Sequence, residues 1–192
     1  MKGVIKMITK NGPYEGTYWD EDTRLMVQTD MIDENEENPR DSVEMTPDDP
    51  AFLSLVEDIM GNSNINHTPI QVYYKDRKFK LIAGHRRLRA IQYINKSNLK
   101  NSPTHIFATL MPEPKTKFDE RKMMFSAEET SKRWGDVRKF IFFRDMLKEL
   151  IQRNQDENLI TNPEHLVQEM KRATSMTAST VTTFYSFAEN PV

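Results

Sequence analysis

Residues 81–90 have the sequence Leu-Ile-Ala-Gly-His-Arg-Arg-Leu-Arg-Ala, which joins an apolar strand end, a glycine turn and the start of an amphipathic helix. Glycine lets the backbone approach an anion closely, and the free N–H groups of a first helical turn point outward as donors. The arginines add forked donors whose charge is permanent. This run predicts a polyphosphate site, although a strand, a tight turn and a solvated basic helix would give the same pattern.

The overall charge gives no signature of nucleic-acid binding, because 27 basic and 29 acidic residues leave a formal net charge of -2. The charge is nevertheless unevenly distributed along the chain. Residues 33–58 hold ten acids and one base, Arg40, whereas residues 75–89 hold seven bases and one acid, Asp76. An anion site therefore belongs in the second block.

The chain has no cysteine, which excludes disulfides, thiolate nucleophiles and cysteine-ligated zinc. Its four histidines are scattered and form no metal-binding pattern. No apolar run approaches the roughly 20 residues of a membrane-spanning helix, and the amino terminus lacks the apolar segment of a signal peptide. We therefore expect a cytoplasmic protein with no membrane partner.

The first part of the chain is expected to be a mixture of strands and helices. A helix is expected to be capped by Thr46, to have Pro47 at its first position and to end at Gly61. The other predicted elements are strands at 4–9, 24–29, 70–74, 79–82 and 105–111, an acidic loop at 33–45 and a helix from 86 to about 95 with Leu88, Ile91 and Ile94 inward. The strands at 70–74 and 79–82 are expected to form a hairpin that leads into the glycine turn.

Beyond a proline-containing linker at 112–115 the sequence predicts only helices. These are a helix over 119–130, a long helix capped by Asp136, a helix from Pro163 to about Arg172 and a helix from Thr177. In the long helix, one set of apolar residues fits a 3.6-residue period and is expected to face the core: Val137, Phe140, Ile141, Met146, Leu147, Leu150 and Ile151. The short connection between the last two helices has the spacing of a helix-turn-helix, but two ordinary helices packed at an angle would have it too.

Several motifs, taken in order, resemble those of the ParB family over roughly residues 30–187. Residues 81–90 resemble its Gly-Glu-Arg-Arg-x-Arg-Ala box, which is the most specific part of the likeness. The weaker matches are Asn38-Pro39-Arg40, the helix at 53–60, Thr68-Pro69-Ile70-Gln71-Val72, Glu129-Thr130-Ser131-Lys132-Arg133 and the helix pair from Pro163 onward. The resemblance implies an α+β fold: a ParB/sulfiredoxin-like small mixed sheet with helices over 1–112, and an all-α domain over 113–192 with a helix-turn-helix at 163–187.

ParB proteins are partition factors that bind DNA, and their amino-terminal domain binds CTP with magnesium and closes as a clamp. The resemblance therefore implies double-stranded DNA, a nucleoside triphosphate and Mg²⁺ as partners, with CTP favoured, and a nucleotide-gated dimer associated with a nucleoid or plasmid. Glu129 would bind the metal together with Thr130 and would act in hydrolysis. The nucleotide-binding positions implied are Thr68, Pro69, Ile70, Gln71, Gly84, His85, Arg86, Arg87, Arg89 and Arg133.

Three substitutions distinguish this chain from the family pattern. His85 replaces a glutamate beside the phosphates, Thr130 replaces the asparagine beside the acid, and Lys132 replaces a glutamine. The shorter threonine side chain reaches a metal differently, so any triphosphatase activity is expected to be slow or absent. The histidine removes a negative charge beside the phosphates, which leaves the choice of nucleotide open.

The expected helix-turn-helix has few bases, since its second helix carries hydroxyls and neither Lys nor Arg. Affinity for DNA depends largely on such bases, so this part alone should bind DNA weakly. The candidate DNA contacts are Lys171, Arg172, Thr177, Ser179, Thr180 and Thr183.

The function predicted from these observations is a ParB-like, nucleotide-dependent DNA-binding switch. The chain is expected to be a compact relative from a mobile element or phage, or a truncated chain, because it ends at Val192 without the carboxy-terminal dimerisation domain of longer ParB proteins. Two alternatives stay open. One is a ParB-like, metal-dependent DNase or phosphotransferase, and the other is a non-catalytic interaction protein.

Overall fold

The structure, a computed structural model, describes residues 10–19, 24–35, 45–61, 68–97, 102–128, 135–159 and 161–189. The chain divides into two compact units, Met1–Glu113 and Pro114–Val192. The predicted strand at 4–9 and the Asn38-Pro39-Arg40 motif lie outside the described residues. Among the residues described, no helix is both long and apolar enough to cross a membrane.

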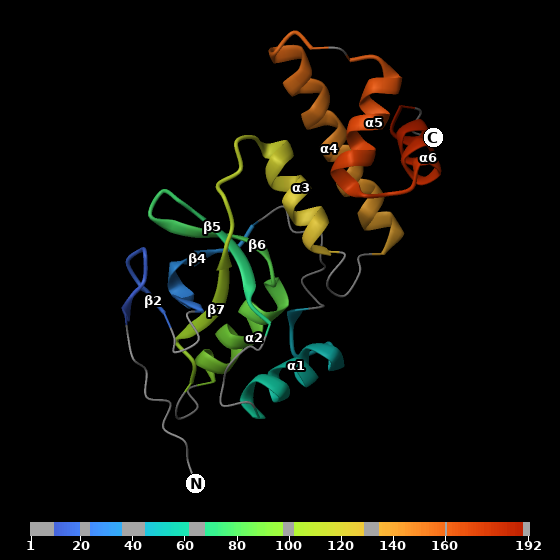
Figure 1. The fold of residues 1–192 in the computed structure, drawn as a ribbon. Helices are drawn as coiled ribbons and strands as arrows, with labels where there is room; N and C mark the ends of the chain where they lie inside the picture. Colours follow the sequence, from blue (N-terminus) through green and yellow to red (C-terminus); the bar gives the residue numbers. More distant parts are fainter. Residues whose placement is uncertain are drawn as a thin grey trace. The chain divides into compact units, whose positions relative to one another are not determined.

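A seven-stranded mixed sheet forms the centre of the first unit (Figure 1). Its strand order is β1-β2-β3-β7-β5-β6-β4. Pairing is parallel between β4 and β6 and between β5 and β7, and antiparallel elsewhere. The strands are β1 (Lys10–Asn11), β2 (Thr17–Trp19), β3 (Leu25–Gln28), β4 (Ile32–Asp33), β5 (Ile70–Lys75), β6 (Lys78–Ala83) and β7 (His105–Leu110), with a 3₁₀ turn η1 (Thr29–Met31) before β4.

The predicted hairpin is confirmed as β5 and β6, joined by a two-residue turn. Asp76 and Arg77 both have positive φ, 52° and 61°, which matches the primed turns that suit the twist of paired strands. At the other end of the hairpin, Gln71 pairs with Ala83, and the register shifts between Gln71 and Val72. The hairpin therefore brings the start of β5 beside the end of β6, directly before Gly84.

The core of the first unit is formed by the sheet and by two helices, α1 (Pro50–Gly61) and α2 (His85–Lys96). The predicted inward positions of α2 are confirmed, because Leu88, Ile91 and Ile94 are at most 1% exposed. Helix α1 contributes Phe52, Val56 and Ile59 to the same core. Apolar residues at this 3.6-residue spacing bury one face of each helix and hold it in place.

The predicted start of α1 is wrong. The helix begins at Pro50 rather than Pro47, and the residue before it, Asp49, accepts a hydrogen bond at Oδ1 from the Ala51 N–H at 3.0 Å. Both prolines suit a first helical position, but only Pro50 is followed within two residues by an apolar side chain buried in the core, that of Phe52. Thr46 instead accepts the Asp49 N–H at its carbonyl, in a turn that precedes the helix.

The described part of the second unit is helical, as predicted. Its helices are α3 (Lys117–Glu128), α4 (Asp136–Asp156), α5 (Pro163–Thr174) and α6 (Ala178–Glu189). Side chains from several of these helices are fully or almost fully buried, among them Phe143, Met146, Leu150, Leu166, Met170 and Val181.

Two details of α4 differ from the prediction. Gly135, and not Asp136, is the residue before the first helical turn. Val137 and Ile141 were expected to face the core but are 73% and 43% exposed, whereas Phe142 and Phe143 are buried. A 3.6-residue period fixes the spacing of the buried stripe but does not fix the residue at which the stripe begins.

Candidate functional site

The turn at Gly84 requires glycine for two separate reasons. Gly84 has φ 102° and ψ 21°, a left-handed conformation that side chains rarely adopt. A Cβ placed there would lie 2.5 Å from Cγ2 of Ile70, so the chain at β5 leaves no room for one. The backbone of the turn therefore packs directly against the start of β5.

Helix α2 begins immediately after this turn, one residue earlier than predicted. The first N–H bonded within the helix is that of Leu88, which donates to the Gly84 carbonyl at 3.0 Å. The N–H groups of His85, Arg86 and Arg87 thus belong to the first turn, where the helix itself supplies no acceptor. Such a turn presents donors and the positive end of the helix dipole to an anion.

Arg87 links the two segments that were predicted to bind the nucleotide, Thr68–Gln71 and Gly84–Arg87. Its Nη1 donates to the carbonyl oxygens of Thr68 and Pro69, at 2.5 and 2.7 Å. The structure thereby brings Thr68, Pro69 and Ile70 beside the glycine turn and the first turn of α2. We call this group, Thr68–Gln71 with Gly84–Arg87, the anion site.

Arg86 carries the positive charge at the centre of the anion site. Its side chain is 16% exposed, and its Nη2 lies 3.3 Å from Oδ2 of Asp49, whose side chain is 19% exposed. The Nε atom of Arg86 is buried and has no hydrogen-bond partner among the described residues. A buried donor left in this state is costly, so a ligand oxygen that accepts from it would be favoured.

The other predicted nucleotide-binding residues of the first unit differ in their surroundings. Arg89 donates through Nε to Oε2 of Glu34 at 2.7 Å, so its charge is balanced by a carboxylate. His85 is 5% exposed and Ile70 is fully buried, so both side chains pack within the unit. Gln71 is half-buried in β5.

Acids from the block at 33–58 pair with bases from the block at 75–89, an arrangement that sequence reasoning missed. Asp33 contacts Lys80 at 2.6 Å, and Glu34 and Asp49 contact Arg89 and Arg86 as described above. The opposite charge balances of the two blocks were the available signal, but charge alone does not specify which side chains meet. The acidic block thus supplies counter-ions to the basic one.

The predicted metal and catalytic residues Glu129 and Thr130, together with Arg133, lie outside the described residues. Within the described residues, no group of three or more His, Cys, Asp or Glu side chains is arranged to hold a metal ion. The described anion site therefore consists of donors and arginines.

In the second unit, the turn between α5 and α6 contains Ser175 in the left-handed conformation, with φ 54°. The candidate DNA contacts Lys171, Arg172, Ser179 and Thr183 are exposed. Thr177 has a structural role as well, because its Oγ1 accepts the Thr180 N–H at 3.3 Å and lies 2.9 Å from the Thr180 hydroxyl. These contacts are those of an N-cap for α6.

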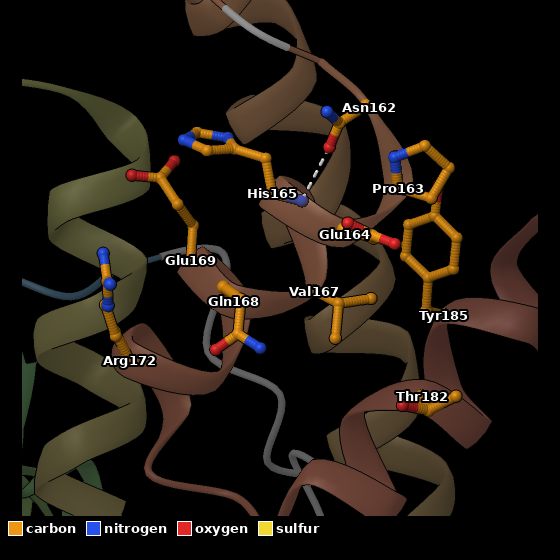
Figure 2. A pocket seen from close by; sticks show the side chains of 10 residues that line it. All are labelled: Asn162, Pro163, Glu164, His165, Val167, Gln168, Glu169, Arg172, Thr182 and Tyr185. Atoms are coloured by element: carbon orange, nitrogen blue, oxygen red, sulfur yellow. Dashed lines mark hydrogen bonds between the residues drawn. The ribbon is translucent and has the colours of Figure 1, made fainter.

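A groove of about 680 Å³ lies along α5 and α6, and sequence reasoning did not predict it (Figure 2). It contains acids as well as a base: Glu164, Glu169 and Arg172 all line it, and Glu169 is paired with Arg153 at 2.8 Å. Burial raises the pKa of Tyr185, also at this groove, and the Glu189 carboxylate raises it further. The mixture of charges gives the groove no preference for an anion.

Comparison with known proteins identifies the fold. No protein-family model matches the sequence, and no curated protein matches it. Among solved structures, the chain is similar to the pNOB8-like ParB N-domain, with a TM-score of 0.54 and 12% identity over 86% of this chain and 64% of that one. The chain is also similar to the C222₁ form of a pNOB8-like ParB-N domain, with a TM-score of 0.52 and 12% identity over 85% of this chain and 66% of that one.

A third structure is the C-terminally truncated chromosome-partitioning protein ParB from Caulobacter crescentus complexed with CTP-gamma-S. It shares 15% identity over 86% of this chain and 78% of that one, with a TM-score of 0.37.

The chain has the fold of a ParB N-domain, and the fold predicted from the resemblance is confirmed. Its mixed sheet followed by helices is the architecture that the resemblance implies. The chain spans slightly less than two thirds of the two structures that it matches at a TM-score above 0.5. The helix-turn-helix stays a prediction.

Proposed function

We propose that this protein is a ParB-like, nucleotide-dependent DNA-binding switch. In this proposal the anion site of the first unit binds the triphosphate of a nucleotide, with CTP favoured, and the second unit binds double-stranded DNA. The observation that carries the proposal is the largely buried Arg86, at the first turn of a helix that follows a glycine-only turn. Its Nε donor has no hydrogen-bond partner among the described residues.

The anion site has the chemistry that a polyphosphate needs. N–H groups at a helix start and a guanidinium beside them can bind several phosphate oxygens at once. The segment Thr68–Gln71, which Arg87 links to the start of α2, would contact the base and sugar. Glu129 and Thr130 would hold a magnesium ion, whose chemistry is to bridge and neutralise phosphate oxygens.

The proposed role of the second unit is weak, charge-dependent binding of DNA. Lys171 and Arg172 are exposed on α5, and the hydroxyls of Ser179 and Thr183 are exposed on α6. Because α6 contributes no Lys or Arg, affinity from this unit alone is expected to be low. Nucleotide-gated dimerisation would join two such units on one DNA and raise the overall affinity.

Calorimetric titration of the full chain with CTP, ATP, GTP and UTP in magnesium buffer tests the proposal, followed by phosphate-release measurements with and without DNA. We expect CTP to bind most tightly and phosphate release to be slow. Arg86→Ala is expected to lower the affinity by at least about tenfold, because a charged hydrogen bond to phosphate is lost.

Lys96→Ala is the matched control, because it removes one positive charge from the opposite end of the same helix. It should leave nucleotide affinity unchanged. Absence of binding to any nucleoside triphosphate, or an Arg86→Ala variant that binds as the wild type does, would contradict the proposal. Magnesium-dependent nicking of supercoiled plasmid that is lost in Glu129→Ala would instead favour the DNase alternative.

A further inference from the structure

One carboxylate, that of Asp49, connects the starts of the two helices of the first unit. Its Oδ1 accepts the Ala51 N–H of α1 at 3.0 Å, and its Oδ2 lies 3.3 Å from Nη2 of Arg86 in α2. Both charged side chains are more than four-fifths buried. The negative charge of Asp49 therefore lies against Arg86 of the anion site.

The backbone around Asp49 holds this carboxylate in position. The Asp49 N–H donates to the Thr46 carbonyl at 3.1 Å, and the Asp49 carbonyl accepts from Phe52 and Leu53 at 2.9 and 3.1 Å. Phe52 is 1% exposed and anchors this end of α1 in the core. With its backbone and one oxygen already bonded, Asp49 stays beside Arg86 when a ligand arrives.

A fixed carboxylate has opposite effects on two forms of the same ligand. A bare polyphosphate that contacts Arg86 would bring its negative charge near the Asp49 carboxylate on the same guanidinium, and like charges repel each other in a partly buried site. A polyphosphate that carries a divalent cation presents positive charge, which a carboxylate oxygen attracts directly or through water. The same acid therefore opposes the first form and favours the second.

We propose that Asp49 is a specificity-determining residue, which makes the anion site select a polyphosphate as its divalent-cation complex over the metal-free anion. This inference rests on the proposed function, since it requires that the site binds polyphosphate. In this inference the residue that precedes α1, and not the arginine-containing helix α2, distinguishes the charge states of the ligand.

The test is a calorimetric titration of the full chain with inorganic tripolyphosphate. It is carried out once in buffer that contains Mg²⁺ and once in buffer that contains EDTA. The wild type should bind the magnesium complex at least about tenfold more tightly than the metal-free anion. Asp49→Asn keeps an oxygen that caps α1 and removes the charge. In this variant, affinity for metal-free tripolyphosphate should rise about tenfold, and the ratio of the two affinities should fall towards one.

Glu113→Gln is the matched control. It also removes one carboxylate from an ion pair in the first unit, with Lys75 at 3.1 Å, but at the opposite end of β5 from Ile70. It should keep the wild-type ratio. Asp49→Ser, which also keeps a capping oxygen, serves as a second variant, and thermal unfolding checks that each variant is folded.

An unchanged ratio in the folded Asp49 variants would overturn the inference, as would a Glu113→Gln variant that changes the ratio as much as Asp49→Asn does. These results differ from failure of the proposed function. If the wild type binds neither tripolyphosphate nor any nucleoside triphosphate in either buffer, the anion site itself is refuted.

Discussion

The starts of α2 and α6 make an instructive comparison, because each helix follows a short turn with a left-handed residue. Before α2 that residue is Gly84, which packs against Ile70 and leaves the first helical turn without a side-chain cap. Before α6 it is Ser175, and Thr177 then caps the helix with its own hydroxyl. The start of α2 has no side-chain cap and the start of α6 has one, so two helices that follow similar turns begin differently.

The largest predicted effect concerns Gly84, the left-handed residue before α2. Gly84→Ala should destabilise the protein by about 3 kcal/mol, because strained backbone adds to a clash with Ile70. Gly61→Ala, at a helical glycine where the added Cβ has open space, should cause no loss of stability. Chemical denaturation measures both variants. If Gly84→Ala were as stable as the wild type, the steric requirement for glycine before α2 would be contradicted.

A smaller effect is expected from the arginine that fastens the anion site. Arg87→Ala removes two hydrogen bonds to the Thr68 and Pro69 carbonyls and should cost about 2 kcal/mol. Arg89→Ala breaks a more exposed ion pair with Glu34 and should cost less than about 1 kcal/mol. Thermal unfolding of the two variants gives the comparison. If Arg89→Ala were the more destabilising change, Arg87 would not be the residue that holds the site together.

The smallest predicted effect tests the cap of α6. Thr177→Ala should destabilise the second unit by about 1 kcal/mol, whereas Thr177→Asn should restore the loss, since asparagine caps helices equally well. Hydrogen exchange of the first amides of α6 measures the change locally. If both variants exchange as the wild type does, the α6 start is not stabilised by its own cap, and its contrast with α2 disappears.

The parts of the fold that the sequence predicted well are those determined by neighbouring residues. The hairpin, the glycine turn and the inward face of α2 follow one another within residues 70–96, and each depends on local turn chemistry or on a short period. The strand at 105–111 was also predicted, from its apolar and β-branched residues.

The parts that escaped prediction depend on residues far apart in the chain. Asp49 and Arg86 are 37 positions apart, and Glu34 and Arg89 are 55 positions apart, so no local pattern indicates that they pair. The exposure of Val137 in α4 likewise depends on how helices distant in sequence pack together. The residues of the anion site could thus be predicted from the sequence, and their carboxylate counter-ions could not.

The short strand β4 has a consequence for the behaviour of the protein at high concentration. A sheet ends in unpaired backbone groups, and a long, flat, apolar edge invites another chain to add to it and aggregate. Both outermost strands here, β1 and β4, are two residues long. On β4, Asp33 also contacts Lys80 of the longer strand β6, which places charge along that border. We therefore expect this sheet to resist edge-to-edge association between copies.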